Sequence, residues 1–115
     1  MSRTTYNKAG FSLNNFELIG TLVSLHQQVN HLGVKIVTTE SYQKSNSDEW
    51  VNNDEFHYVK VFFSDLQNKI NGFNEGDVIR LEGRIQPWSQ KQEDESYKNG
   101  VDFKVTAAQR VMMKA

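Results

Sequence analysis

The chain has 115 residues, a formal net charge of −1 and no cysteine. Its length suffices for one domain with a single hydrophobic core, and the missing thiols exclude disulfide bonds and thiolate metal sites. The near-neutral charge argues against a broad basic face for duplex DNA but permits a few local cations, and no apolar run approaches the roughly 20 residues of a membrane-spanning helix.

The first expected element is a long strand over residues 13–29, preceded by a polar stretch without periodicity. We expect residues 1–12 to form a flexible N-terminal arm and residues 13–113 to form the folded domain. Apolar and polar residues alternate along the strand, and Gly20 interrupts it. A glycine inside a strand favours a sharp bend or a close backbone approach, which small closed barrels require.

A second strand is predicted over residues 33–41, with Lys35 directed outward. Strand alternation places Tyr42, at the end of this strand, with the inward-facing residues. Residues 43–54 are polar and predict a loop that contains Trp50. A tryptophan in a hydrophilic loop either packs back into the core or meets a partner, and the sequence favours neither.

The central strand, residues 55–64, alternates without showing a plainly polar face. One face carries three rings and a cation, namely Phe56, Tyr58, Lys60 and Phe62. The inward face is formed by His57, Val59, Val61 and Phe63. Rings interleaved with a cation form a surface on which unpaired bases can stack while phosphates find charge. The alternative is a strand buried on both sides, with Lys60 reaching out to water.

A short helix is predicted to follow the central strand. Ser64 is a candidate N-cap, and Gln67 stands where its capping-box partner would be. Gly72 can end the helix in the left-handed conformation. One apolar stripe is expected to plug an end of a barrel, and it consists of Leu66, Ile70 and Phe73.

Two further strands are predicted over residues 78–88 and 101–113, joined by a charged hairpin loop with Asn99-Gly100 as its turn signal. In the first of them, Ile79, Leu81 and Ile85 face inward. Its outward row is Arg80, Glu82, Arg84, Gln86 and Trp88. In the last strand, one side carries Val101, Phe103, Val105 and Ala107.

The expected order is three strands, one short helix and two more strands. An all-β chain of this order predicts the OB-fold, a five-stranded Greek-key barrel with a helix between the third and fourth strands. In this fold, ligands bind on the outer face of the second and third strands and at the loops that join strands one to two and four to five.

The chain resembles bacterial and phage-type single-stranded DNA-binding proteins over roughly residues 14–113. The matching segments occur in the family's order and with similar spacing. They are Leu18-Ile19-Gly20-Thr21-Leu22, Thr38-Thr39-Glu40-Ser41-Tyr42, Glu55-Phe56-His57 through Val61-Phe62, Leu81-Glu82-Gly83-Arg84-Ile85 and Val111-Met112-Met113.

The resemblance implies non-catalytic, largely sequence-independent binding and protection of single-stranded DNA in replication, recombination or repair. It implies base stacking on Tyr42, Phe56, Phe62 and Trp88, with Lys35, Lys60 and Arg84 as the nearest cations. Trp50 and Tyr58 are further candidates, either for stacking or for assembly. The family most often has tryptophan at the positions of Tyr42 and Phe56. In this chain, the segment between Gly83 and Trp88 is two residues shorter than in the usual family pattern.

The resemblance also implies partners and a location. We expect single-stranded DNA and further copies of the chain, in a dimer or tetramer, as partners, with no membrane, cofactor, metal or small-molecule substrate. The implied location is the cytoplasm of a bacterial cell, with a phage or plasmid as a further possible source of the gene. Cellular members of the family also carry a flexible tail with an acidic, hydrophobic tip that recruits other enzymes. The sequence stops at Ala115, just past the last expected strand, either as a short type or as a trimmed chain, so such recruitment is not assumed.

Other functions have less support in the sequence. Catalysis would need a hydroxyl nucleophile beside His26, His31 or His57, and the chain contains no glycine-rich phosphate loop. The alternative of a different class is an OB-fold module that binds proteins, or a primosome-type accessory factor, in which the outward rings would be covered by a partner. RNA as the ligand also stays open.

Overall fold

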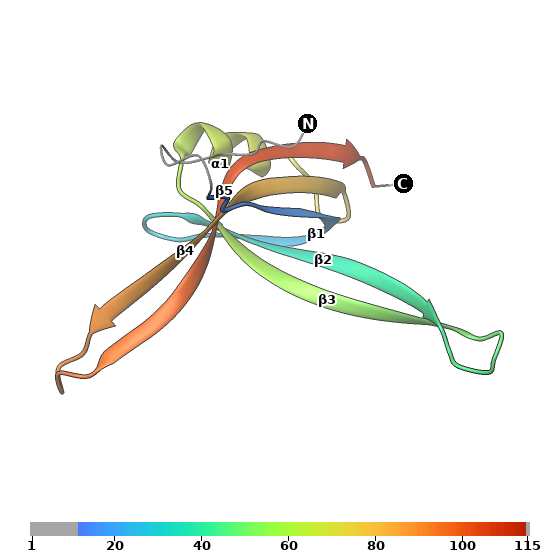
Figure 1. Cartoon of the computed structure of the whole chain (residues 1–115). Helices are drawn as coiled ribbons and strands as arrows, with labels where there is room; N and C mark the ends of the chain where they lie inside the picture. The colour runs from blue at the N-terminus through green and yellow to red at the C-terminus, as the bar shows by residue number, and fades with distance from the viewer. Residues whose placement is uncertain (1–11, 115) are drawn as a thin grey trace.

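The computed structural model describes residues 12–114, so the expected N-terminal arm lies outside the described residues except for Ser12. The chain folds in the predicted order of three strands, a helix and two strands (Figure 1). The elements are β1 (Phe16–Gln27), β2 (Leu32–Gln43), β3 (Trp50–Val61), α1 (Ser64–Asn71), β4 (Val78–Lys91) and β5 (Tyr97–Met112).

The five strands close into a barrel in the order β1-β2-β3-β5-β4. Neighbouring strands are antiparallel except β3 and β5, which run parallel and are paired at Lys60 and Lys104. This is the predicted OB-fold topology, with α1 between β3 and β4. Ligand-binding faces of this fold lie outside the barrel, so the outward rows of the strands decide what the chain can bind.

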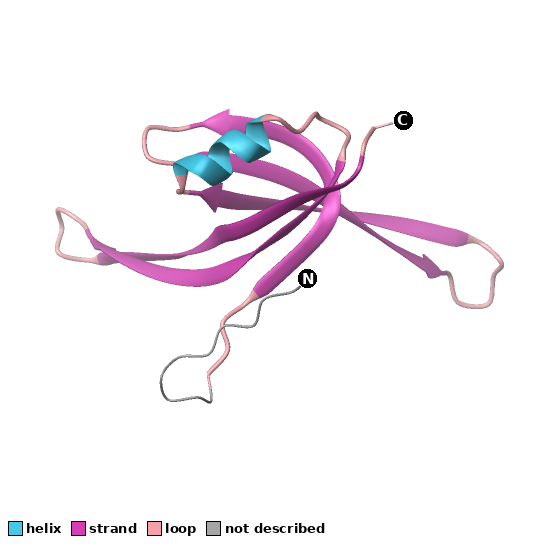
Figure 2. Cartoon of the chain, turned by 90° about the horizontal axis from the view of Figure 1, so that it is seen from above, coloured by secondary structure: helices cyan, strands magenta, loops and turns pink. Residues whose placement is uncertain are grey.

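Two hairpins extend beyond the barrel and diverge from each other (Figure 1). We call residues 39–54 the β2–β3 arm and residues 84–103 the β4–β5 arm; neither contains a buried residue. Seen from above, the two arms leave the barrel on different sides, and α1 packs on the barrel itself (Figure 2). The arms therefore owe their shape to their ladders and cross-strand contacts rather than to a core.

The core lies inside the barrel and draws on every strand and on the helix. Its members are Leu22, Leu32, Val34, Ile36, Val59, Val61, Ile70, Ile79, Leu81, Val105 and Ala108. Leu66 and Phe73 pack against it, which confirms the predicted apolar stripe of α1. Gly20 is also explained, because a Cβ atom there would lie closer than 3.0 Å to the carbonyl oxygen of Val37 on the neighbouring strand.

The start of the helix differs from the capping-box prediction. Phe63 occupies the N-cap position in an extended conformation, and no side chain caps the helix. Gln67 Nε2 instead donates to the carbonyl oxygen of Val61 at 2.9 Å, so this side chain ties α1 back to the end of β3. Gly72, with φ of −80°, ends the helix in a right-handed rather than a left-handed conformation.

Both hairpins are longer than predicted. β3 begins at Trp50, so residues 50–54 belong to a strand, and the turn is closed by a hydrogen bond from Lys44 N–H to Glu49 O at 2.9 Å. The second turn lies at residues 92–96, which places Asn99 and Gly100 within β5. The predictions failed because an arm that is solvated on both sides has no face that must be apolar, so its sequence shows no regular hydrophobic alternation.

Several inward or outward assignments were wrong. Tyr42, which strand alternation placed with the inward residues, is 52% exposed because it lies on the β2–β3 arm, beyond the core. Phe63 is 55% exposed because β3 ends at Val61, before the alternation reaches it. Glu82 is buried and bonds to Arg80 at 2.7 Å rather than facing solvent. The β4–β5 register shifts between Glu82 and Gly83, so the inward–outward alternation of side chains along β5 is reversed beyond this point. As a result Ala108, not Ala107, enters the core.

Candidate nucleic-acid interface

The outer face of β2 and β3 carries exposed rings beside a cation. Lys35 pairs with Tyr58 in the β2–β3 ladder, and Val37 pairs with Phe56, so these side chains share one side of the sheet. Phe56 is 53% exposed and Tyr58 is 67% exposed. The alternative of a strand buried on both sides is therefore wrong. We call Lys35, Phe56, Tyr58 and Lys60 the ring face.

The ammonium group of Lys35 lies over both rings. Its Nζ atom is 4.9 Å from the centroid of Phe56 and 5.3 Å from that of Tyr58. At these distances a cation is attracted to the negative face of an aromatic ring. The ring face thus holds its own cation next to the surfaces on which a base could stack.

Within the described part of the chain, Lys60, unlike Lys35, is paired with a carboxylate. Its Nζ atom forms an ion pair with Asp102 Oδ1 of β5 at 3.0 Å. A phosphate approaching Lys60 must therefore compete with a carboxylate that is already in place. The same ion pair joins the ring face to the β4–β5 arm, because Lys60 and Asp102 come from the two strands that close the barrel.

Phe62 lies beyond the end of β3 and is half-buried. Its ring centroid is 5.6 Å from that of His31, and Lys104 Nζ lies 5.2 Å from the ring. Lys104 also approaches Phe63, at 5.6 Å. Lys104 was not among the predicted cations, although its position between the apolar residues Phe103 and Val105 marks it as outward-facing.

The β2–β3 ladder separates the two rings near the tip of its arm. Trp50 pairs with Gln43 and Tyr42 pairs with Val51, without a register shift along the ladder. Alternation therefore puts Trp50, 66% exposed, on the side of Phe56 and Tyr58, and puts Tyr42, 52% exposed, on the opposite side. Of the predicted rings on these two strands, Tyr42 is the one that the fold does not bring to the ring face.

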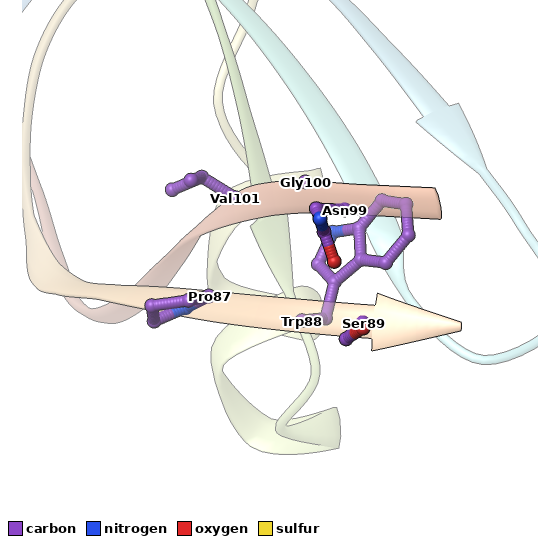
Figure 3. A pocket seen from close by; sticks show the side chains of 6 residues that line it. All are labelled: Pro87, Trp88, Ser89, Asn99, Gly100 and Val101. Carbon is purple, nitrogen blue, oxygen red and sulfur yellow. The ribbon is translucent and has the colours of Figure 1, made fainter. Parts of the chain in front are cut away.

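The β4–β5 arm presents the remaining predicted residues. Arg84 pairs with Lys104 and Trp88 pairs with Gly100, so they share the side that also carries Asp102. Figure 3 shows the indole of Trp88 reaching from β4 across to β5, where it lies beside Gly100 and Asn99. Arg80, in contrast, is bound by Glu17 at 2.8 Å and by Glu82 at 2.7 Å. The hydrogen bond that the guanidinium of Arg80 donates to the Glu17 carboxylate is the main cause that raises the pKa of Arg80.

Two hollows adjoin the ring face. One, of about 300 Å³, lies where the β1–β2 turn meets β3 and is lined by His26, His31, Lys35, Tyr58 and Lys60 among others. The second, of about 370 Å³, is an apolar groove between β1, β3 and β5, and Phe16, Phe56 and Phe103 help to line it. Phe16 and Phe103 meet edge to face at 5.6 Å. Sequence reasoning missed this groove because its rings come from three separate strands.

Two classes of site are not found among the described residues. Residues 12–114 contain no group of three histidine, aspartate or glutamate side chains placed to hold a metal ion. Within the same range, no helix combines the length and the apolar character that crossing a membrane would require.

Comparison with known proteins gives no match to a protein-family model or to a curated protein sequence. Solved structures do match. A single-stranded DNA-binding protein of Plasmodium falciparum, solved in complex with single-stranded DNA, is 14% identical with a TM-score of 0.63, over 90% of this chain and 97% of that one. A small single-stranded DNA-binding protein of Streptomyces coelicolor is 15% identical with a TM-score of 0.54, over 84% and 92%.

A deletion mutant of the single-stranded DNA-binding protein of Thermus aquaticus is 19% identical, with a TM-score of 0.62 over 86% of this chain and 50% of that one. At these identities the likeness concerns the backbone. The chain shares its OB-fold with single-stranded DNA-binding proteins from several organisms.

Proposed function

We propose that this protein binds single-stranded DNA without catalysis and largely without sequence preference, and that it protects the strand during replication, recombination or repair. The observation that carries the proposal is the ring face, where Phe56 and Tyr58 are exposed beneath the ammonium group of Lys35. The shared fold supports it, since one neighbour of the same fold was solved with single-stranded DNA.

The binding step follows from this arrangement. A base that stacks on Phe56 or Tyr58 displaces Lys35 from the ring, and the freed ammonium group is then close to the phosphate of the same nucleotide. Every base has a flat π-face, so stacking accepts all four bases. Duplex DNA binds poorly, because its bases are already stacked on each other.

The proposed path of the strand runs from one arm to the other. It starts at Trp50, crosses the ring face, passes Phe62 and the Lys60–Asp102 ion pair, and continues to the β4–β5 arm. The residues proposed to line it are Lys35, Trp50, Phe56, Tyr58, Lys60, Phe62, Arg84 and Trp88. Tyr42, on the other side of the β2–β3 arm, contacts only a strand that wraps around the tip.

Assembly of several copies is a second part of the proposal. Ile19 on β1 and Met112 on β5 are apolar and exposed on the outside of the barrel. A dimer or tetramer would cover them, as a protein partner would in the alternative function of an interaction module. Light scattering after size-exclusion chromatography measures the mass, and Ile19→Glu is expected to lower it if β1 lies in the interface.

The test of the proposed function is a fluorescence titration. The intrinsic emission of Trp50 and Trp88 is followed while oligo-dT or a duplex of the same length is added, at low and at high salt. Quenching by oligo-dT alone, weakened by salt, is the expected result. No response to either nucleic acid would reject the proposal and favour the protein-interaction module.

A further inference from the structure

We propose that Gly100 is a positioning residue for base stacking, because it leaves open the space in which the indole of Trp88 is held across the β4–β5 arm. This inference rests on the proposed function, since the ligand of the indole is one unpaired base of the single strand. Gly100 is the residue that gives this ring a fixed orientation before DNA arrives.

The geometry comes from a directly opposed pair. Trp88 and Gly100 face each other in the β4–β5 ladder, and the indole reaches over β5 at this point (Figure 3). A Cβ atom built on Gly100 would lie 2.5 Å from Cε2 and 2.9 Å from Nε1 of Trp88. Real Cβ atoms essentially never approach other heavy atoms below 3.0 Å. The ring therefore occupies the place that any other side chain at position 100 would need.

The other close-packed glycines of the barrel show what is particular about Gly100. A Cβ atom at Gly20 or Gly83 would collide with a backbone carbonyl group of the adjacent strand, so the fold itself requires those glycines. At Gly100 the three nearest atoms all belong to the Trp88 ring. Its φ is not positive either, so no special backbone conformation demands a glycine there. The absence of a side chain at Gly100 therefore makes room for the Trp88 ring.

A ring that is held in one orientation loses less freedom on stacking than a ring that rotates freely. The backbone of β5 supports one side of the indole, and Trp88 is half-buried although the arm has no core. Its orientation is set in the free protein, so little side-chain freedom is lost when a base binds. Arg84 and Lys104 face the same side of the ladder and can meet the phosphates that flank the stacked base.

The first arm of the test measures binding. Gly100→Ala is expected to weaken oligo-dT binding about threefold, and Trp88→Ala about fivefold or more, as for one stacked base. Ser89→Ala, next to Trp88 but facing the other side of the ladder, is the control. Adding Gly100→Ala to Trp88→Ala should cause no further loss, because Gly100 acts only through the indole.

The second arm needs no DNA. In a Trp50→Phe background Trp88 is the remaining tryptophan, and Gly100→Ala should make its fluorescence more readily quenched by acrylamide, with little change in melting temperature. In the unmodified protein, the ring current should shift a Gly100 Hα proton upfield, and Trp88→Ala should abolish that shift. This NMR measurement tests whether the Trp88 ring lies against Gly100, even if the Gly100→Ala variant folds poorly.

The outcomes separate the inference from the function on which it rests. Unchanged acrylamide quenching together with an unshifted Hα proton would overturn the seating of the ring. A further loss of affinity when Gly100→Ala is added to Trp88→Ala would overturn the positioning role. If the unmodified protein does not bind oligo-dT, the proposed function is wrong. The Trp88 ring then does not stack on bases, whatever the result of acrylamide quenching.

Discussion

The β2–β3 arm and the β4–β5 arm are both antiparallel ladders without a buried residue, yet they present their aromatic side chains differently. At the base of the first arm, Phe56 and Tyr58 are exposed, and the ammonium group of Lys35 lies over both rings. On the second arm, Trp88 lies against the backbone at Gly100. If the proposed function holds, these are two ways to keep a ring available for a base: one ring surface lies beneath a lysine ammonium group, and the other is held against the backbone.

The ladders themselves are also held differently. Along the β2–β3 arm, polar side chains bond across the strands, with Thr39 Oγ1 2.7 Å from Asp54 Oδ1 and Ser41 Oγ 2.6 Å from Asn52 Oδ1. The β4–β5 arm follows directly after a register shift and uses the contact of an indole with a glycine instead. Polar pairs let the first arm extend far into solvent, whereas the bulge turns the second arm away from the barrel.

The largest effect is expected from removing both exposed rings of the ring face. Phe56→Ala combined with Tyr58→Ala should remove two stacking surfaces, each worth about 1–3 kcal/mol of binding free energy in OB-fold proteins that bind single strands. Fluorescence anisotropy with labelled oligo-dT measures the loss. Tyr97→Ala, an exposed ring on the other side of the β4–β5 arm, is the matched control. Binding that survives the double substitution would shift the path of the strand to the β4–β5 arm.

A smaller effect is expected at the tip of the β2–β3 arm. Trp50 is exposed and has no glycine opposite it, so we expect Trp50→Ala to cost less affinity than Trp88→Ala. Because Trp50 lies at the far end of the path, its loss should show with long oligo-dT and vanish with short oligomers. A titration series over oligomer length tests this. Equal losses at every length would place Trp50 in the centre of the site.

The ion pair between Lys60 and Asp102 should change the salt dependence more than the affinity. Asp102→Asn releases Lys60 for a phosphate, so the slope of log K against log salt should steepen by about 0.7, the value for one more phosphate contact with a single strand. Lys60→Ala should flatten the slope more in the Asp102→Asn background than in the unmodified protein. Affinities measured at four or five salt concentrations give these slopes. Identical slopes in all variants would remove Lys60 from the phosphate path.

The smallest effect on binding, and a clear one on stability, is expected at Asp77. The buried carboxylate accepts the backbone N–H groups of Asn74 at 2.8 Å and Lys114 at 2.9 Å, and these bonds lower its pKa below the ordinary 3.8. Since the pKa is lower in the folded state, the stabilisation is present above the unfolded value and is lost as the pH falls through the folded value. Asp77→Asn should therefore reduce the acid dependence of the melting temperature below about pH 4. Both arms should unfold together there, because both depend on the barrel.

The barrel was predictable where one side of a strand faces the core. Val34, Ile36, Val59 and Val61 alternate with outward residues, and all four are buried as the pattern indicates. The stripe of α1 was found for the same reason. Burial imposes a period on the sequence, and that period can be read without a structure.

The arms and contacts between distant strands could not be predicted in this way. Solvent on both sides removes the period, so the ladder from Trp50 to Asp54 looked like a loop. The Lys60–Asp102 ion pair joins residues far apart in the chain, and no local pattern records it. Gly100 was mistaken for a turn residue because a glycine that makes room for a ring has the same sequence signal as one that bends the chain.

The closure of the barrel has a mechanical consequence. Among the described residues, β3 and β5 are paired at Lys60 and Lys104 alone, so a short seam joins the sheet that bears one arm to the sheet that bears the other. We expect such a seam to act as a hinge, at which the two arms move relative to each other while the core strands keep their other partners. We expect hydrogen exchange at this seam to be faster than elsewhere in the barrel, and a bound strand that spans both arms to slow it. The same joint would let one protein fit strands of different curvature.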